Sequence, residues 1–227
     1  MKKGDLIIHV GLPRSGSTFI QKKIFKRLNM DKYYIRGTNF GGLNIETPIK
    51  KDKINIFTKE SLSNIRRSYD KNCRFKNIDR LKILFPDAKI LFIHRDDTSF
   101  RKSIYKMMIQ EGYHRSYEEF IEKIKKMNHY LSNDIYYDKL VDNFDCVKRI
   151  EFKLLLENKK RFVEEIYDFI GCDIIDGIDM HPINKSWNDN RTENARSLNR
   201  YFKSTWNKHA LLPRKLNPYA FIYKIGK

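Results

Sequence analysis

Hydrophobic residues follow two different spacings along the first 170 positions of this chain. Short apolar runs are typical of buried strands, and they occupy residues 5–10, 54–58 and 89–94, while residues 146–152 alternate between apolar and polar as a strand does. Apolar residues three or four positions apart predict helices between and after these runs. The expected helices are residues 17–28, 78–85, 98–110, most of 116–131, 135–144 and 158–170. This alternation predicts an α/β fold, with a parallel sheet flanked by helices on both faces and ligands at the carboxyl ends of the strands.

Glycine and proline mark where several of these elements end. Pro86 stops the second helix, and Gly171 closes the last one. Residues 33–51 are rich in Gly, Asn and Thr and therefore predict a long loop.

The last quarter of the chain is less regular. A polar loop is expected over residues 184–194 and a helix near 195–206, followed by a basic and aromatic tail. The chain has 227 residues, enough for one α/β domain and too few for two. We therefore expect residues 1–227 to form a single domain, with 172–227 as its irregular closing segment.

Composition restricts the partners without selecting one. The formal net charge of +18 predicts a field that attracts anions such as nucleic acid, anionic lipid, acidic polysaccharide or a phosphorylated nucleotide, although a Lys-rich solvated surface explains most of these charges. No apolar run approaches the roughly 20 residues of a membrane span, and no signal-peptide core follows the first residues, so a cytoplasmic location is expected. Three scattered cysteines support neither a disulfide framework nor a zinc site.

The loop after the first strand carries the clearest chemical signal. Residues 11–18 read GLPRSGST, which is the G-x4-G frame of a P-loop with Ser17 where nucleotide triphosphatases have Lys. Backbone amides between Gly11 and Gly16 are expected to curl around an anion, with Ser17 and Thr18 adding hydroxyls. Arg14 supplies a cation inside the loop. The alternative is a glycine-containing turn that Ser17 caps.

Hydrolysis of ATP or GTP needs Mg²⁺, usually held in part by an acidic residue at another strand end. Asp96 and Asp97 are the nearest candidates, yet Arg95 precedes both. A donor that carries a sulfonate needs positive charge at its bridging oxygen and a grip on its phosphates. Arg14 and the loop amides fit that need, and we expect no metal.

Two motifs together resemble the sulfotransferases that use 3′-phosphoadenosine 5′-phosphosulfate (PAPS), in particular the bacterial and carbohydrate-type branches. They are GLPRSGST after DLIIHV, and the strand KILFIHR with Ser103 eight positions after Arg95. The resemblance implies a P-loop-type sheet and the transfer of a sulfonate group from PAPS to a hydroxyl or amine by metal-independent in-line displacement. It also implies release of 3′-phosphoadenosine 5′-phosphate (PAP).

The resemblance assigns donor contacts residue by residue. It implies that Arg95 and Ser103 bind the 3′-phosphate of PAPS, and that Lys185 and Ser186, in INKSW, lie in a stretch that closes over the nucleotide. The residues implied to bind the 5′-phosphosulfate are Gly11, Pro13, Arg14, Ser15, Gly16, Ser17 and Thr18. The alternatives are an Arg95 paired with Asp96 or Asp97, and a Ser103 without a function.

A base is expected near the sulfur, because the acceptor loses a proton as it attacks. Glu60 follows the strand of residues 54–58 at the same sheet edge as the phosphate loop, although a first turn of a helix also favours a Glu. His9 lies within the first strand and is the second candidate, with a structural histidine as its alternative.

The expected acceptor is a carbohydrate or another small metabolite, and nucleic acid is not expected. Two other functions stay open at this point. One is a P-loop kinase or nucleotidase that depends on Mg²⁺, and the other is a non-catalytic polyanion-binding module suggested by the charge and the tail of residues 203–227. The sequence predicts no oligomeric state.

Overall fold

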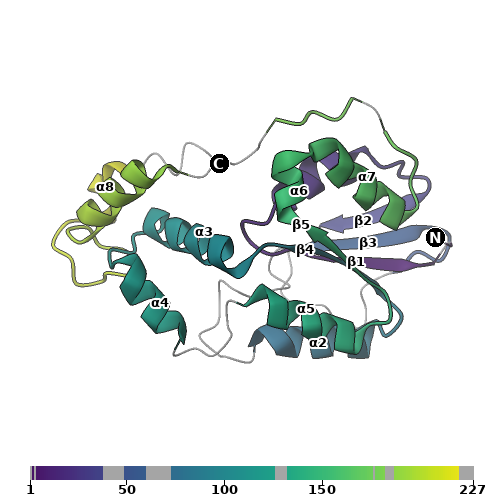
Figure 1. The fold of residues 1–227 in the computed structure, drawn as a ribbon, viewed down its shortest axis with the longest axis horizontal. Helices are drawn as coiled ribbons and strands as arrows, with labels where there is room; N and C mark the ends of the chain where they lie inside the picture. Colours follow the sequence, from purple (N-terminus) through teal and green to yellow (C-terminus); the bar gives the residue numbers. More distant parts are fainter. Residues whose placement is uncertain are drawn as a thin grey trace. The chain divides into compact units, whose positions relative to one another are not determined.

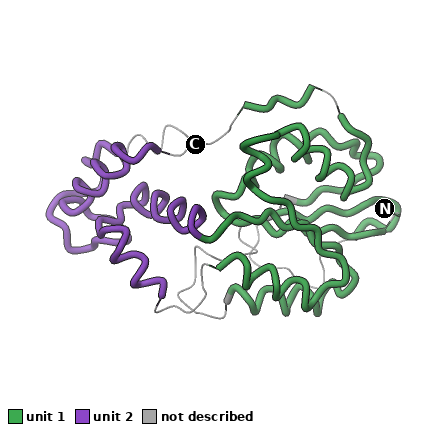
Figure 2. Tube along the Cα trace, in the orientation of Figure 1, with its two compact units in different colours: residues 1–97, 130–183 green, residues 98–129, 184–227 purple. Residues whose placement is uncertain are grey.

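The computed structural model describes residues 2, 4–37, 49–59, 73–125, 132–175, 177–181 and 187–219. The chain divides into two compact units (Figure 2). Unit 1 consists of Met1–Asp97 and Tyr130–Ile183, and unit 2 consists of Thr98–His129 and Asn184–Lys227. Unit 1 contains the sheet, whereas the described part of unit 2 is helical and irregular.

Five parallel strands form the sheet of unit 1, in the order β2-β3-β1-β4-β5. The strands are β1 (Leu6–Val10), β2 (Tyr33–Gly37), β3 (Ile54–Lys59), β4 (Lys89–His94) and β5 (Val147–Glu151). After β1 the chain passes to the β2 edge, returns through β3, and then crosses to the other side of β1. The order of strands therefore reverses at β1 and β4, which is where ligands bind in open α/β sheets.

Helices cover both faces of this sheet (Figure 1). One face carries a continuous helical run, α1 (Ser17–Phe19), η1 (Ile20–Ile24) and η2 (Phe25–Arg27), together with α6 (Phe152–Glu157) and α7 (Lys159–Ile170). The opposite face carries α2 (Cys73–Leu84) and α5 (Asn133–Asn143). Coverage on both sides explains why every residue of β1 is buried.

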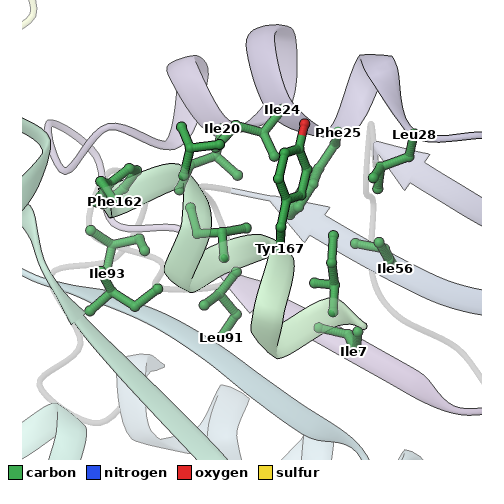
Figure 3. Close-up of a cluster of buried hydrophobic side chains, with 14 of the residues drawn as sticks. Ile7, Ile20, Ile24, Phe25, Leu28, Ile56, Leu91, Ile93, Phe162 and Tyr167 are labelled. Carbon is green, nitrogen blue, oxygen red and sulfur yellow. The ribbon is translucent and has the colours of Figure 1, made fainter. Parts of the chain in front are cut away.

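A hydrophobic core lies between the sheet and the helical layer of α7 and η1 (Figure 3). Leu91 and Ile93 of β4 point toward this layer, because alternate strand residues face the same side. Phe162 and Tyr167 of α7 meet them from the helix side. On the opposite face the ring of Phe92 packs against Tyr136 of α5, at 5.7 Å between centroids.

The ends of α7 follow from its flanking residues. The side chain of Asn158 accepts a hydrogen bond from the Arg161 amide at 3.0 Å, which caps the first turn. Gly171 ends the helix with a φ of 66°, in the left-handed region that glycine adopts without strain. The Gly171 carbonyl then accepts a hydrogen bond from the Tyr33 hydroxyl at 2.8 Å, so the helix end is tied to β2.

Unit 2 is built around α3, α4 and α8. These helices span Asp97–Gln110, Tyr117–Lys125 and Asp189–Asn199, and η4 (Arg214–Leu216) follows. Asn199 connects the end of α8 to the end of α3, because its side-chain amide donates to the carbonyls of Ile109 and Tyr113. The rings of Tyr105, Tyr113 and Phe120 pack together in the interior.

The predicted α/β class, with a parallel sheet and helices on both faces, is confirmed. Four expected strands are present, and a fifth, β2, lies where a long loop was expected. Of residues 33–36, whose burial is described, Tyr33 alone is fully buried, so this edge strand lacks the apolar run of the inner strands. The extent of the domain over residues 1–227 stays a prediction.

Three helices differ from expectation. Helix α2 begins at Cys73, and α6 is a separate short helix directly after β5. Helix α8 occupies Asp189–Asn199, so it begins inside the expected polar loop and ends within the helix expected near 195–206. It begins early because Asn188 caps it by accepting from the Arg191 amide at 2.8 Å. Within the described ranges, no helix is both long and apolar enough to cross a membrane.

Shortening a side chain in the core between the sheet and α7 should destabilise unit 1. Leu91 is fully buried between the sheet and α7, so Leu91→Ala is expected to lower the free energy of unfolding by about 2–5 kcal/mol through lost burial and a residual cavity. Urea denaturation measures this change. Leu156→Ala on α6 is the matched control, since Leu156 is 66% exposed and should change stability by less than about 0.5 kcal/mol. Equal losses in both variants contradict the assigned core.

Candidate functional site

The loop that follows β1 bends sharply at the carboxyl edge of the sheet. The Ser15 amide donates to the Leu12 carbonyl at 3.3 Å and closes a turn. Arg14 has a φ of 67° and Gly16 a φ of 79°, both in the left-handed region. For Arg14 this conformation costs about 1–2 kcal/mol, because its Cβ approaches the neighbouring carbonyl oxygen. Backbone strain of this kind concentrates at functional sites.

Gly16 is required at its position for a second reason. A Cβ built there lies 2.8 Å from Cδ2 of Leu155 and 3.5 Å from the Phe152 ring. A side chain at position 16 would therefore have to displace the Leu155 methyl group of helix α6. Glycine at position 16 therefore permits both the left-handed backbone conformation and the close packing of α6 against the loop.

Two serine hydroxyls in the loop are buried but differ in their hydrogen bonds. The Ser17 hydroxyl donates to the Leu12 carbonyl at 3.1 Å, so it braces the loop itself. Ser15 is fully buried, and among the described residues its hydroxyl has no hydrogen-bond partner. A buried hydroxyl without a partner costs about 1–3 kcal/mol, so such a group calls for an explanation. A ligand anion held by the loop provides one.

Arg95 joins the loop from the end of β4. Its Nη1 donates to the Arg14 carbonyl at 2.5 Å, and its guanidinium lies 4.7 Å from the centroid of the Phe152 ring. Burial and, to a smaller extent, the nearby charge of Arg14 together lower the pKa of Arg95 to about 10, against an opposing effect of Asp96. Two like charges are thus held close together at the edge of the sheet, an arrangement that an anion stabilises.

His9 lies in the core. Its ring is fully buried, with Nδ1 2.8 Å from Oγ1 of Thr58 and an edge-on contact to Phe25. Desolvation lowers the pKa of His9 to about 3, so the imidazole is neutral at physiological pH and a weak base. These surroundings favour the structural alternative, and a catalytic role for His9 stays a prediction.

The other predicted site residues have different locations. Gly11 and Pro13 are buried in the loop, and Thr18 is half-buried at the start of its helix. Ser103 is buried on α3 in unit 2, whereas Arg95 belongs to unit 1, so their shared phosphate site stays a prediction. Glu60, Lys185 and Ser186 lie outside the described residues.

Sequence reasoning did not identify Phe152 and Leu155 as site residues. Both reach the loop because α6 starts directly at the carboxyl end of β5. The place of β5 beside β4 in the sheet was the information needed to find them. In the described ranges, no group of three or more His, Cys, Asp or Glu side chains is arranged to hold a metal ion.

These features define a class of protein: an α/β protein whose first strand leads into a loop with the glycine spacing of a P-loop, with Arg14 inside the loop and Arg95 beside it. The family model of the sulfotransferase family matches residues 50–176, which is more than half of the chain. The chain therefore belongs to the sulfotransferase family, and the predicted enzyme class is confirmed. The match includes Arg95 and Ser103 but begins after the loop of residues 11–18.

The structure of a sulfotransferase with a TM-score above 0.5 supports the fold. A sulfotransferase from Alicyclobacillus acidocaldarius matches with a TM-score of 0.54 and 15% identity, over 87% of this chain and 95% of that chain. The mouse sulfotransferase SULT7A1, complexed with PAP, matches with a TM-score of 0.47 and 13% identity, over 99% of this chain and 76% of that chain. No curated protein matches the sequence significantly.

The two serines of the loop predict opposite effects on stability. Ser15→Ala removes a buried hydroxyl without a partner, so the free energy of unfolding should stay equal or rise by up to about 1 kcal/mol. Ser17→Ala, two positions away and equally buried, loses its bond to Leu12 and should cost about 1 kcal/mol. Urea denaturation of both variants without ligand compares them. A clear loss in Ser15→Ala means that its hydroxyl has a structural partner.

Proposed function

We propose that this chain is a PAPS-dependent sulfotransferase that transfers a sulfonate group to a hydroxyl or amine of a carbohydrate or another small metabolite. One observation carries the proposal. Arg14 and Arg95, from the ends of two neighbouring strands, meet around a loop whose buried Ser15 hydroxyl has no partner among the described residues. In a chain of the sulfotransferase family, a doubly phosphorylated donor is the anion that fits this charge.

The residues of the loop suit the 5′-phosphosulfate end of the donor. The first N–H groups of the helical run from Ser17 lack intrahelical partners, so they are suited to bind phosphate oxygens. Ser15 adds a hydroxyl donor and Arg14 a guanidinium. When bound, PAPS supplies the activated sulfonate and leaves as PAP. We assign Arg95 and Ser103 to the 3′-phosphate, with Lys185 and Ser186 as further nucleotide contacts.

Positive charge from arginine also underlies the proposed independence from metal ions. Charge develops on the bridging oxygen as the sulfonate leaves, and a fixed guanidinium stabilises it through charge-assisted hydrogen bonds. We propose Glu60 as the base that takes the acceptor proton, since the low pKa of His9 makes that imidazole a weak base.

Donor binding tests the proposal directly. Arg14→Ala and Arg95→Ala should each weaken PAP binding by about 10- to 100-fold, because each leaves a phosphate without its charge-assisted partner. Isothermal titration in the presence of EDTA measures the affinities. Arg161→Ala on α7 is the control, since Arg161 is exposed and pairs only with Glu165 in the described structure.

Two results contradict this prediction. Unchanged PAP affinity in both variants removes the two arginines from the donor site. A wild-type protein that binds ATP with Mg²⁺ more tightly than PAP is a P-loop kinase or nucleotidase instead.

The base is tested separately from the donor site. Glu60→Gln should leave PAP affinity within about twofold and lower sulfonate transfer by about 10²- to 10⁴-fold, because the amide accepts no proton. A panel of candidate acceptors with labelled PAPS identifies a substrate and measures transfer. Glu157→Gln on α6 is the matched control at an exposed position. Full activity in the Glu60 variant excludes Glu60 as the base.

A further inference from the structure

The junction between β4 and α3 carries Arg95 but has little regular structure of its own. Residues 95 and 96 lie between the last strand residue, His94, and the first helical residue, Asp97. Main-chain hydrogen bonds of the sheet therefore stop one residue before Arg95. Something outside the strand must hold this segment if its guanidinium is to keep a fixed position.

Asn133, the first residue of α5, holds the junction at two points. Its side-chain Nδ2 donates to the Arg95 carbonyl at 2.7 Å, and its main-chain amide donates to Oδ1 of Asp97 at 2.6 Å. Asn133 is fully buried, so water does not compete for these hydrogen bonds. One residue thus spans Arg95 and the beginning of α3.

Arg74 fixes the orientation of the Asn133 side chain. Its Nη2 donates to Oδ1 of Asn133 at 2.9 Å, and its Nη1 donates to the Ser132 carbonyl at 2.9 Å. A guanidinium only donates hydrogen bonds, so the oxygen of the amide must face Arg74. The NH₂ group of Asn133 must then face Arg95. The Tyr136 ring, centred 4.1 Å from the Arg74 guanidinium, holds that group in place.

A fixed backbone is needed because the Arg95 side chain faces repulsion. Burial disfavours the charged form of Arg95 and lowers its pKa, and the nearby charge of Arg14 adds to that effect. The guanidinium nevertheless stays against the Arg14 carbonyl and the Phe152 ring. Anchoring the main chain of Arg95 limits the other positions that its side chain can reach.

We propose that Asn133 is a positioning residue for Arg95. It sets the Arg95 guanidinium against the phosphate loop before the donor binds, and it acts through the Arg95 main chain without touching the donor. Such preorganisation raises affinity because less ordering is left to occur on binding. The inference rests on the proposed function, which assigns Arg95 to the 3′-phosphate.

Asn133→Asp isolates the relevant hydrogen bond. A carboxylate still accepts from Arg74, so the buried contact on that side is kept, while the donor to the Arg95 carbonyl is lost. Asn143→Asp is the matched control at the other end of α5. There, too, a side-chain amide donates to a main-chain carbonyl, that of Lys139 at 2.8 Å, within the same helix.

The readout is the ratio of affinities for PAP and for adenosine 5′-monophosphate, which lacks the 3′-phosphate. Asn133→Asp should lower this ratio roughly five- to tenfold, the loss of one buried hydrogen bond. Asn143→Asp should leave it unchanged. In an Arg95→Ala background, Asn133→Asp should have no further effect on PAP affinity, because a residue that acts through Arg95 has nothing left to position.

The outcomes separate this inference from the proposed function. If Arg95→Ala leaves PAP affinity unchanged, Arg95 does not bind the donor. Both the proposed donor site and the positioning role of Asn133 are then wrong. If Arg95→Ala weakens PAP binding but Asn133→Asp does not, or if both nucleotides weaken equally, Asn133 is structural only and the inference falls. Should Asn133→Asp fail to fold, Asn133→Ser is measured in the same way, since its shorter side chain does not reach the Arg95 carbonyl.

Discussion

The parallel pairing of β1 with β4 determines where the chemistry of this chain lies. Val10, the last residue of β1, is level with Phe92, so β4 extends two residues further before it ends. That offset carries Arg95 past the strand end to the height of the loop, where its guanidinium meets the Arg14 carbonyl. If β1 and β4 paired in another register, Arg14 and Arg95 would lie at different heights along the strand direction. The rest of unit 1 keeps this pair of strands in place.

Several features that cost stability occur together in this small region. Arg14 has an unfavourable backbone conformation, the Ser15 hydroxyl is buried without a partner in the described structure, and Arg95 is a partly buried cation beside another cation. The donor that we propose for this site offsets the last two costs, because its phosphates accept hydrogen bonds and neutralise positive charge. Natural sequences depart from favourable local structure mainly at functional sites, and here the departures cluster in one loop and its neighbour.

Much of the fold was predictable because the inner strands are buried on both faces. The apolar runs of β1, β3 and β4 locate these strands to within about one residue. Strand β2 was missed because it lies at the edge, where, of residues 33–36, Tyr33 alone is fully buried. Local patterns identify a strand by its burial, so the strand with the least burial gives the weakest signal.

The arrangement of the site residues was likewise predictable only in part. The meeting of Arg14 and Arg95 was predictable, since both follow strands that end at one edge of a parallel sheet. The orientation of His9 was not, because alternation separates two faces only where one of them is exposed, and β1 is buried on both. Phe152 and Asn133 reach the site through contacts between elements distant in sequence, which spacing along the chain does not encode.

The loss of the P-loop lysine is consistent with a donor that has two separate phosphate groups. A lysine at position 17 carries a mobile point charge on a long side chain, which suits the adjacent phosphates of a triphosphate. Here Ser17 bonds back to Leu12 and closes the loop on itself, so the charge must come from elsewhere. In the proposed site the guanidinium groups of Arg14 and Arg95 supply it, and a planar guanidinium suits a phosphate at a fixed position. The Arg95 bond to the Arg14 carbonyl fixes the Arg95 charge against the backbone of the loop, so its position is a property of the fold before any ligand binds.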